Sequence, residues 1–117
     1  KVQQKAARVG FDWDKVEDAF EKVYEEANEL KEIFGTGNRD RIEEELGDLL
    51  FAVVNVSRFL DVQPELALCR TIDKFINRFE YMEHRSAKID KKLQEMSLDE
   101  MDRLWNEAKM RLSEKKL

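Results

Sequence analysis

Apolar side chains recur at intervals of three and four residues along most of this 117-residue sequence. This spacing places them on one face of an α-helix, and no alternating pattern typical of a strand competes with it. Four glycines and a single proline leave few points at which a helix must end. The sequence therefore predicts an all-α protein, and its length predicts a single domain over residues 1–117.

We expect four helices joined by short loops. They cover approximately residues 14–34, 40–60, 64–85 and the segment from residue 97 onward. Asp14 with Glu17, and Ser97 with Glu100, have the spacing of capping boxes, in which side chains satisfy backbone N–H groups at the start of a helix. Gly35 is a natural end for the first helix.

Two segments lie outside these four helices. We interpret residues 1–13 (KVQQKAARVGFDW) as a lead-in to the domain, which suggests that the chain is part of a longer protein. Residues 86–96 (SAKIDKKLQEM) are either a frayed continuation of the third helix or a mobile linker before the last one.

The second helix is apolar on nearly every side. Its main face is formed by Ile42, Leu46, Leu49, Val53, Val56 and Leu60, and the later turns add Leu50, Phe51, Ala52 and Val54. Such a helix is buried on most sides. We therefore expect it to lie centrally in the domain or to pack against a second subunit. The third helix has a narrower stripe, formed by Leu68, Ile72, Phe75, Phe79 and Met82.

Charge and cysteine content exclude several classes of function. The net charge is −5, and lysines and arginines are dispersed, so the chain lacks the basic footprint of a nucleic-acid-binding protein. A single cysteine, Cys69, excludes an intramolecular disulfide and a cysteine-rich zinc site, and we expect it to be buried as a small apolar residue. No apolar run is long enough to span a membrane and no signal-peptide pattern is present, so a cytoplasmic location is expected.

Two pairs of carboxylates at helical spacing are the strongest candidates for a site. Glu26 and Glu29 share one flank of the first helix, and Glu45 and Asp48 share the edge of the apolar face of the second. If the two helices are adjacent, the pairs converge four oxygen ligands suited to Mg²⁺. Gly47 leaves room there for a ligand or a neighbouring helix. The alternative is a solvated, ion-paired helix surface, as we expect for Glu25.

Basic and aromatic residues of the later helices allow two interpretations each. Lys74 and Arg78 flank the apolar stripe of the third helix, where they either pair with the acidic flank or bind polyphosphate oxygens. Trp105 is either a core residue or stacks on a nucleobase. The single histidine, His84, is expected to be exposed, and no Gly-rich phosphate loop, Ser/His/Asp arrangement or HExxH motif is present.

Several segments together resemble the MazG-type all-α nucleoside triphosphate pyrophosphohydrolases. The segments are KVYEEANEL, RIEEELGDLLFAVVNVSRFL, DKFINRF and LDEMDRLWNEAK, in that order. The family's marker is Glu-x-x-Glu, a variable spacer and Glu-x-x-Asp, which Glu26, Glu29, Glu45 and Asp48 match. The opening KVQQKAARVGFDW and the closing Trp-containing helix resemble the C-terminal of the two MazG domains in full-length members. The resemblance covers nearly the whole chain.

The resemblance implies roles for individual residues. The four marker carboxylates match Mg²⁺ ligands, Lys74 and Arg78 match basic residues that meet the phosphates, and Trp105 matches an aromatic residue at the base or sugar. Two segments match the lining of the nucleotide site, namely Lys22, Val23, Tyr24, Glu25 and Glu26, and Arg41, Ile42, Glu43 and Glu44. The resemblance also implies a homodimer with a shared helical bundle. Family members often have Asn at the position of Ile72. The resemblance implies that this difference affects the preference for a base or a sugar.

The function that we expect is Mg²⁺-dependent hydrolysis of a nucleoside triphosphate to the monophosphate and pyrophosphate, for clearing or controlling nucleotide pools. The residues expected to carry catalysis are Glu26, Glu29, Glu45, Asp48, Lys74 and Arg78. The alternative is a catalytically silent helical module that binds a nucleotide or a protein partner in regulation or oligomerisation. Neither function involves a nucleic-acid polymer or a membrane.

Overall fold

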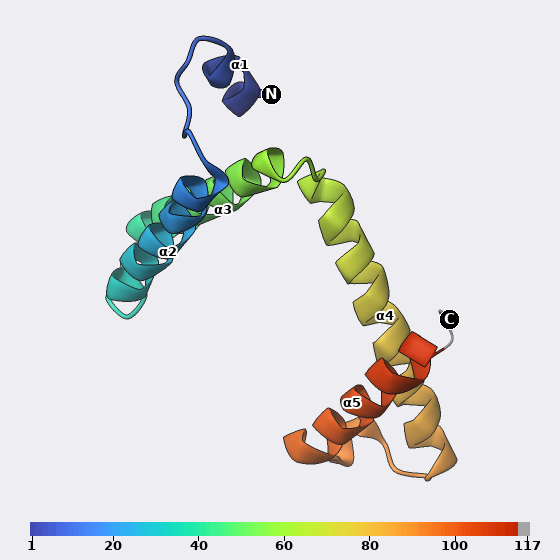
Figure 1. The fold of residues 1–117 in the computed structure, drawn as a ribbon. Helices are drawn as coiled ribbons and strands as arrows, with labels where there is room; N and C mark the ends of the chain where they lie inside the picture. Colours follow the sequence, from blue (N-terminus) through green and yellow to red (C-terminus); the bar gives the residue numbers. More distant parts are fainter. Residues whose placement is uncertain (115–117) are drawn as a thin grey trace. The chain divides into compact units, whose positions relative to one another are not determined.

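All regular secondary structure that the computed structural model describes, over residues 1–114, is helical (Figure 1). The helices are α1 (Val2–Arg8), α2 (Val16–Ile33), α3 (Arg39–Phe59), α4 (Pro64–Lys88) and α5 (Leu98–Glu114), with a short 3₁₀ turn, η1, at Leu93–Glu95. The predicted all-α class is confirmed, and the four predicted helices correspond to α2–α5. The chain forms two compact units, Lys1–Glu65 and the residues from Leu66 onward. None of the described helices is both long enough and apolar enough to cross a membrane.

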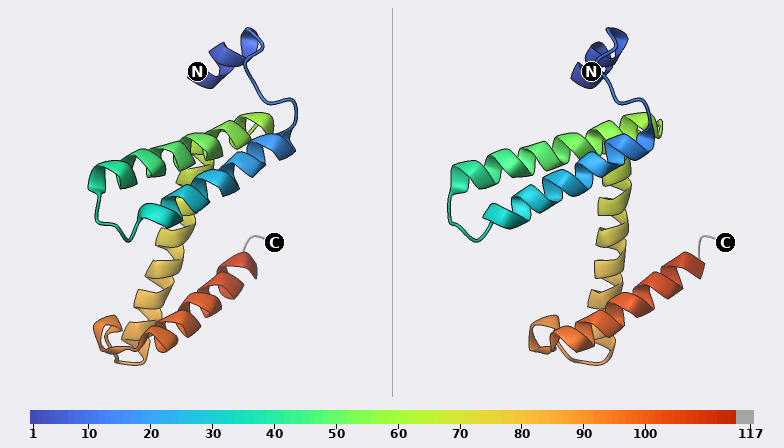
Figure 2. Two further views of the ribbon diagram at one scale, coloured as in Figure 1. Left: turned by 90° about the vertical axis from the view of Figure 1, so that its left-hand side faces the viewer. Right: turned by 60° about the vertical axis from the view of Figure 1, so that its left-hand side comes forward.

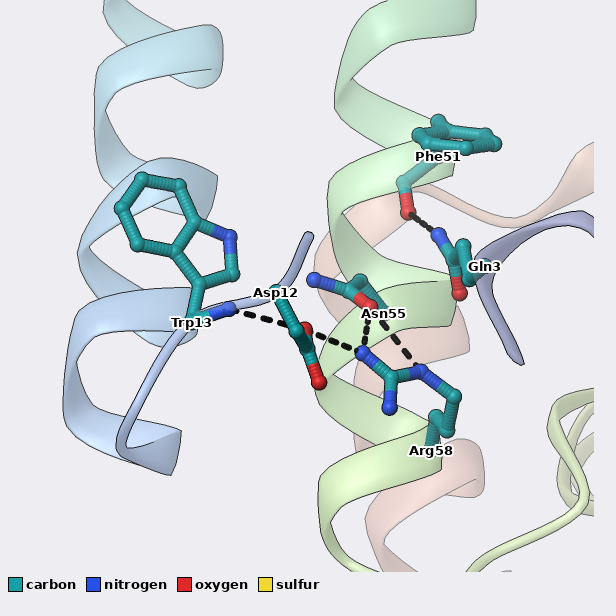
Figure 3. Close-up of polar contacts among 6 residues, drawn as sticks. All are labelled: Gln3, Asp12, Trp13, Phe51, Asn55 and Arg58. Carbon is teal, nitrogen blue, oxygen red and sulfur yellow. Dashed lines mark hydrogen bonds and ion pairs between the residues drawn. The ribbon is translucent and has the colours of Figure 1, made fainter. Parts of the chain in front are cut away.

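The predicted lead-in segment contains an additional helix, α1, and is attached to α3 by polar contacts (Figure 3). The side-chain amide of Gln3 donates to the Phe51 carbonyl at 2.9 Å. The Arg58 guanidinium pairs with Asp12 at 2.6 Å and also donates to the Asn55 side-chain oxygen at 2.8 Å. The hydrogen bond from Arg58 lowers the pKa of Asp12. No residue of α1 is buried, so these contacts, rather than a core, fix the segment on α3.

Helices α2 and α3 form an antiparallel hairpin (Figure 2). A loop at residues 34–38 joins them, close to the predicted position, and Asn38 caps α3 by accepting from the Arg41 backbone N–H at 3.2 Å. The predicted capping box at Asp14 is wrong, because α2 begins at Val16 and its N-cap, Lys15, forms no side-chain cap bond. The first helix also ends slightly earlier than predicted, at Ile33.

The buried face of the hairpin is rotated from the predicted one. The buried residues are Ala19, Glu26 and Ile33 on α2 and Ala52 and Val56 on α3. Val56 belongs to the predicted main face of α3, and the small side chains of Ala19 and Ala52 allow the two helices to approach closely. Larger apolar residues remain substantially exposed on α3, namely Leu46, Leu50, Phe51, Val53, Val54 and Leu60. The predicted burial of α3 on most sides is therefore not found within the first unit, Lys1–Glu65.

In the second unit, α5 packs against the C-terminal part of α4. Met82, Met96 and Leu104 form the core, with Trp105 partly buried against it. The predicted capping box of α5 is confirmed, because Ser97 Oγ accepts from the Glu100 backbone N–H at 3.1 Å.

The segment at residues 86–96 is folded in this structure. Helix α4 continues to Lys88, the buried Ser86 hydroxyl donates to the Lys91 carbonyl, and Lys91 pairs with Glu100 at 2.8 Å. Its mobility as a linker remains a prediction.

The N-terminal part of α4 is more exposed than the sequence suggests. Leu68 is 61% exposed, Ile72 and Phe75 are also exposed, and of the predicted stripe only Met82 is buried. Cys69 is exposed, which contradicts its predicted burial. Periodicity identifies the residues that share a helix face, but it does not show whether another element covers that face. His84 is exposed, as predicted.

Candidate metal and nucleotide site

Three of the four predicted carboxylates lie together on the α2–α3 hairpin. Glu26 and Glu29 of α2 and Glu45 of α3 each place one oxygen within 4.8 Å of the others. The convergence follows from the i, i+3 spacing on α2 and from the antiparallel pairing of the two helices. We refer to these three residues as the carboxylate cluster.

The cluster contains buried oxygens that lack partners. Glu26 is only 6% exposed, while Glu29 and Glu45 are half-buried. Among the described residues, Glu26 Oε2 and Glu45 Oε2 are buried without a hydrogen-bond partner. Burying carboxylate oxygens without partners is costly, and like charges held this close repel one another. A hard divalent cation satisfies both requirements, so the donor set fits Mg²⁺.

Lys22 supplies one positive charge beside the cluster. Its Nζ lies 3.1 Å from Glu26 Oε1 and 3.3 Å from Glu25 Oε1. These contacts, first with Glu26 and then with Glu25, raise the pKa of Lys22. Glu25 is exposed, as expected, and pairs with Lys22.

Asp48, the fourth predicted ligand, lies outside the carboxylate cluster in this structure and is exposed. Three residues along a helix turn the side-chain direction by about 60°, so Asp48 points away from the side on which Glu45 meets α2. A Cβ placed on Gly47 would meet no atom within 4 Å. A neighbouring helix among the described residues of the first unit therefore does not explain the glycine, and room for a ligand there remains a prediction.

The residues predicted to line the nucleotide site flank the cluster on both helices. Val23 and Ile42 are half-buried, whereas Tyr24 is exposed and contacts the Phe20 ring edge-on at 5.3 Å between centroids. Arg41, Glu43 and Glu44 are exposed on the first turns of α3, directly before Glu45. Their contact with a nucleotide remains a prediction.

The predicted phosphate-binding and base- or sugar-binding residues belong to the second unit. Arg78 lies over the Trp105 ring at 5.4 Å, and the Phe75 ring lies 5.2 Å from the same indole. Among the described residues of the second unit, neither Lys74 nor Arg78 pairs with a carboxylate. Ion pairing with the acidic flank of the first helix stays a prediction. Trp105 is half-buried, and one part packs on the core while another faces the Arg78 guanidinium.

The family profile described as the MazG nucleotide pyrophosphohydrolase domain matches residues 14–83, more than half of the chain. The chain belongs to this MazG family. The matched region contains the carboxylate cluster, Asp48, Lys74 and Arg78.

Individual relatives agree with this assignment. This MazG domain is 44% identical over 109 residues to the nucleoside triphosphate pyrophosphohydrolase/pyrophosphatase MazG of Thermotoga maritima. It is 36% identical over 111 residues to the nucleoside triphosphate pyrophosphohydrolase of Escherichia coli K12. Each alignment covers 93% of this chain and 42% of the relative, so the chain spans about two fifths of their length. The uncharacterized protein YabN of Bacillus subtilis is 54% identical over 65 residues, which are 56% of this chain and 13% of that protein.

The MazG domain also contains a polar cluster between α4 and α5 that sequence analysis missed. Tyr81 donates to Glu107 at 2.5 Å, which raises the pKa of Tyr81 and lowers that of Glu107. Arg85 Nε lies 3.1 Å from the same carboxylate without the alignment of a hydrogen bond. These contacts join the two helices close to Trp105. No sequence signal marked them, because the partners are 26 residues apart.

Proposed function

We propose that this MazG domain hydrolyses nucleoside triphosphates to the monophosphate and pyrophosphate in a Mg²⁺-dependent reaction. The printed names of two relatives and the matched family support the reaction class. The single observation that carries the proposal is the pair of buried oxygens on Glu26 and Glu45 that have no hydrogen-bond partner in the described part of the chain. Such a pair is poorly suited to a structural surface and well suited to holding a cation.

Glu26, Glu29 and Glu45 would hold the metal, and Asp48, on the same helix as Glu45 but exposed and outside the cluster, would be a further, weaker oxygen ligand. A bound Mg²⁺ ion would neutralise phosphate charge and polarise the bond at the α-phosphorus. A carboxylate oxygen of the cluster that is free of the cation accepts the proton of the attacking water. The half-buried position of the cluster limits the access of bulk water, which strengthens these electrostatic contacts.

Lys74 and Arg78 bind the phosphates and stabilise the departing pyrophosphate. Among the described residues of the second unit neither side chain pairs with a carboxylate, which supports this role because a phosphate would not have to displace one there. Trp105, with Arg78 lying over it, contacts the base or the sugar. Two segments line the nucleotide site next to the cluster, namely Lys22, Val23, Tyr24 and Glu25, and Arg41, Ile42, Glu43 and Glu44.

A homodimer completes the proposal. Phe51 is 57% exposed, and Leu50, Val53 and Val54 beside it on α3 are also exposed. A large apolar surface of this kind is typical of a protein–protein contact, and the same surface on a second copy would cover it. We further propose that the protein is cytoplasmic and that its reaction clears or controls nucleotide pools.

The test is a product analysis. The protein is incubated with Mg²⁺ and a panel of ribo- and deoxyribonucleoside triphosphates, and the products are separated by chromatography. Monophosphate together with pyrophosphate is the expected result. Diphosphate together with inorganic phosphate would identify a different phosphatase. Nucleotide binding without turnover would support the catalytically silent module instead.

A further inference from the structure

The two oxygens of Glu26 lie in different electrostatic environments. Oε1 pairs with Lys22 at 3.1 Å, and Oε2 is buried without a hydrogen-bond partner. Among the described residues, Lys22 is the only basic side chain that pairs with a carboxylate of the cluster. Without a metal, the ammonium of Lys22 is therefore the counter-charge that the structure provides for three close carboxylates.

A divalent cation at the cluster would weaken this ion pair. The cation would bind the same Glu26 carboxylate that pairs with Lys22, and it would repel the nearby ammonium group of Lys22. The Lys22 side chain is 36% exposed, and a lysine side chain is long and freely rotating. Lys22 can therefore turn away from Glu26 at little cost when another anion is within reach.

We propose that Lys22 is an exchangeable counter-cation, which neutralises Glu26 in the metal-free site and binds a phosphate of the substrate once a divalent cation occupies the carboxylate cluster. The second half of this inference rests on the proposed function, whereas the first half requires only that the cluster binds a divalent cation. The exchange sets the order of binding, because Lys22 becomes available to a phosphate only after the metal has bound.

The first test measures metal affinity without nucleotide. Mn²⁺ prefers the same oxygen ligands as Mg²⁺ and can be titrated by electron paramagnetic resonance. Lys22→Met removes the repelling charge, so it should bind Mn²⁺ about three- to tenfold more tightly than the wild type, allowing for solvent screening. Lys22→Arg, which keeps the charge, and Lys31→Met, which removes an exposed and unpaired lysine of the same helix, should show wild-type affinity. An unchanged or weakened Mn²⁺ affinity in Lys22→Met would overturn the inference.

The second test measures nucleotide affinity at saturating Mn²⁺, using an α,β-methylene triphosphate that cannot be cleaved at that bond. Lys22→Met should bind this analogue about tenfold more weakly, the scale of one charge-assisted hydrogen bond. Opposite changes in the two affinities are the signature of the exchange, because a merely structural lysine would not tighten one and weaken the other. Unchanged binding of the analogue would overturn the phosphate-binding half.

The wild-type measurements separate this inference from the proposed function. A wild type that binds no Mn²⁺ would overturn the metal site and the exchange together. A wild type that binds Mn²⁺ and cleaves triphosphates, with Lys22→Met no tighter for Mn²⁺, would overturn the exchange alone. Circular dichroism of each variant verifies that it is folded, and Lys22→Gln serves as a second neutral variant.

Discussion

Glu26 and Glu45 face one another across the α2–α3 hairpin, and each buries an Oε2 atom that has no partner among the described residues. Together with Glu29 they place three negative charges within a space that fits one cation. The matched MazG profile includes this region. The following predictions derive from this arrangement and from the contacts around it.

Mg²⁺ should stabilise the fold. At a free Mg²⁺ concentration ten times the dissociation constant, the free energy of unfolding should rise by about 1.4 kcal/mol. Thermal unfolding with and without Mg²⁺ measures this rise, with NaCl at equal ionic strength as the control. The rise should disappear in Glu26→Gln and persist in Glu32→Gln, which changes an exposed carboxylate of the same helix. A similar rise in both variants would mean that Mg²⁺ only screens the surface charge.

The carboxylates should differ in their contribution to metal binding without nucleotide. Glu45→Gln removes a residue of the carboxylate cluster. Loss of a residue that only supports a metal ligand typically weakens metal binding by roughly 10- to 100-fold, and Glu45→Gln should weaken Mn²⁺ binding by more than this. Asp48→Asn should weaken it less than about fivefold, because an exposed charge contributes up to roughly 1 kcal/mol. Calorimetric titration of the two variants measures both effects. Equal losses would show that Asp48 is a full ligand of the metal, in a conformation other than the one described.

Gly47→Ala should stabilise the protein by about 1 kcal/mol, the difference in helix propensity between the two residues. The substitution adds a methyl group in open space on α3. Urea unfolding measures the change in free energy. A destabilised variant would show that something outside the described contacts, such as a second subunit or a ligand, packs against this position.

The ion pair between Asp12 and Arg58 should stabilise the attachment of the N-terminal segment in a pH-dependent way. The contact lowers the pKa of Asp12 in the folded protein below its ordinary value of 3.8. The stabilisation is therefore complete above that value and is lost as the pH falls through the lower folded value. Asp12→Asn should lower the melting temperature relative to the wild type at pH 7, and the difference should shrink progressively as the pH falls below 3.8. Asp14→Asn is the matched control, and a difference that persists in acid would contradict the ion-pair explanation.

Arg78→Ala should reduce kcat/KM for triphosphate cleavage by about tenfold or more, the scale of one lost charge-assisted contact. The melting temperature should change little, because in the described part of the second unit the Arg78 guanidinium lies over the Trp105 ring and pairs with no carboxylate. Steady-state kinetics and thermal unfolding separate the two effects. A large loss of stability with unchanged kinetics would identify a structural arginine.

Helix positions could be predicted from the sequence, whereas the orientation of the helices about their axes could not. Breakers and apolar spacing determined α2–α5 to within a few residues. The observed interface of α2 and α3 is rotated from the predicted one, because α3 is apolar on nearly every side and offers several similar faces. Val56 of the predicted main face is buried, whereas Leu46 and Leu60 are exposed. The small residues Ala19 and Ala52 occupy the interface instead. Helix α1 was missed because it is short, has no buried residue and is held by contacts to residues almost fifty positions away.

The candidate site was partly predictable for a geometric reason. Carboxylates spaced i, i+3 on two adjacent helices converge whichever loop joins them, and Glu26, Glu29 and Glu45 do so. The burial of Glu26 in the centre of the interface depends on helix rotation and was not predicted. The same rotation leaves Asp48 outside the cluster. The Tyr81–Glu107 contact depends on the packing of α4 against α5, which no local pattern specifies.

The central claim is that the carboxylate cluster cleaves triphosphates between the α- and β-phosphates. The most direct measurement compares the products formed by the wild type and by Glu45→Ala with Mg²⁺ and a nucleoside triphosphate, with far-UV circular dichroism of both. The account predicts monophosphate and pyrophosphate from the wild type, and no product from a Glu45→Ala variant of unchanged helicity. Wild-type turnover in Glu45→Ala, or release of inorganic phosphate by the wild type, would contradict it.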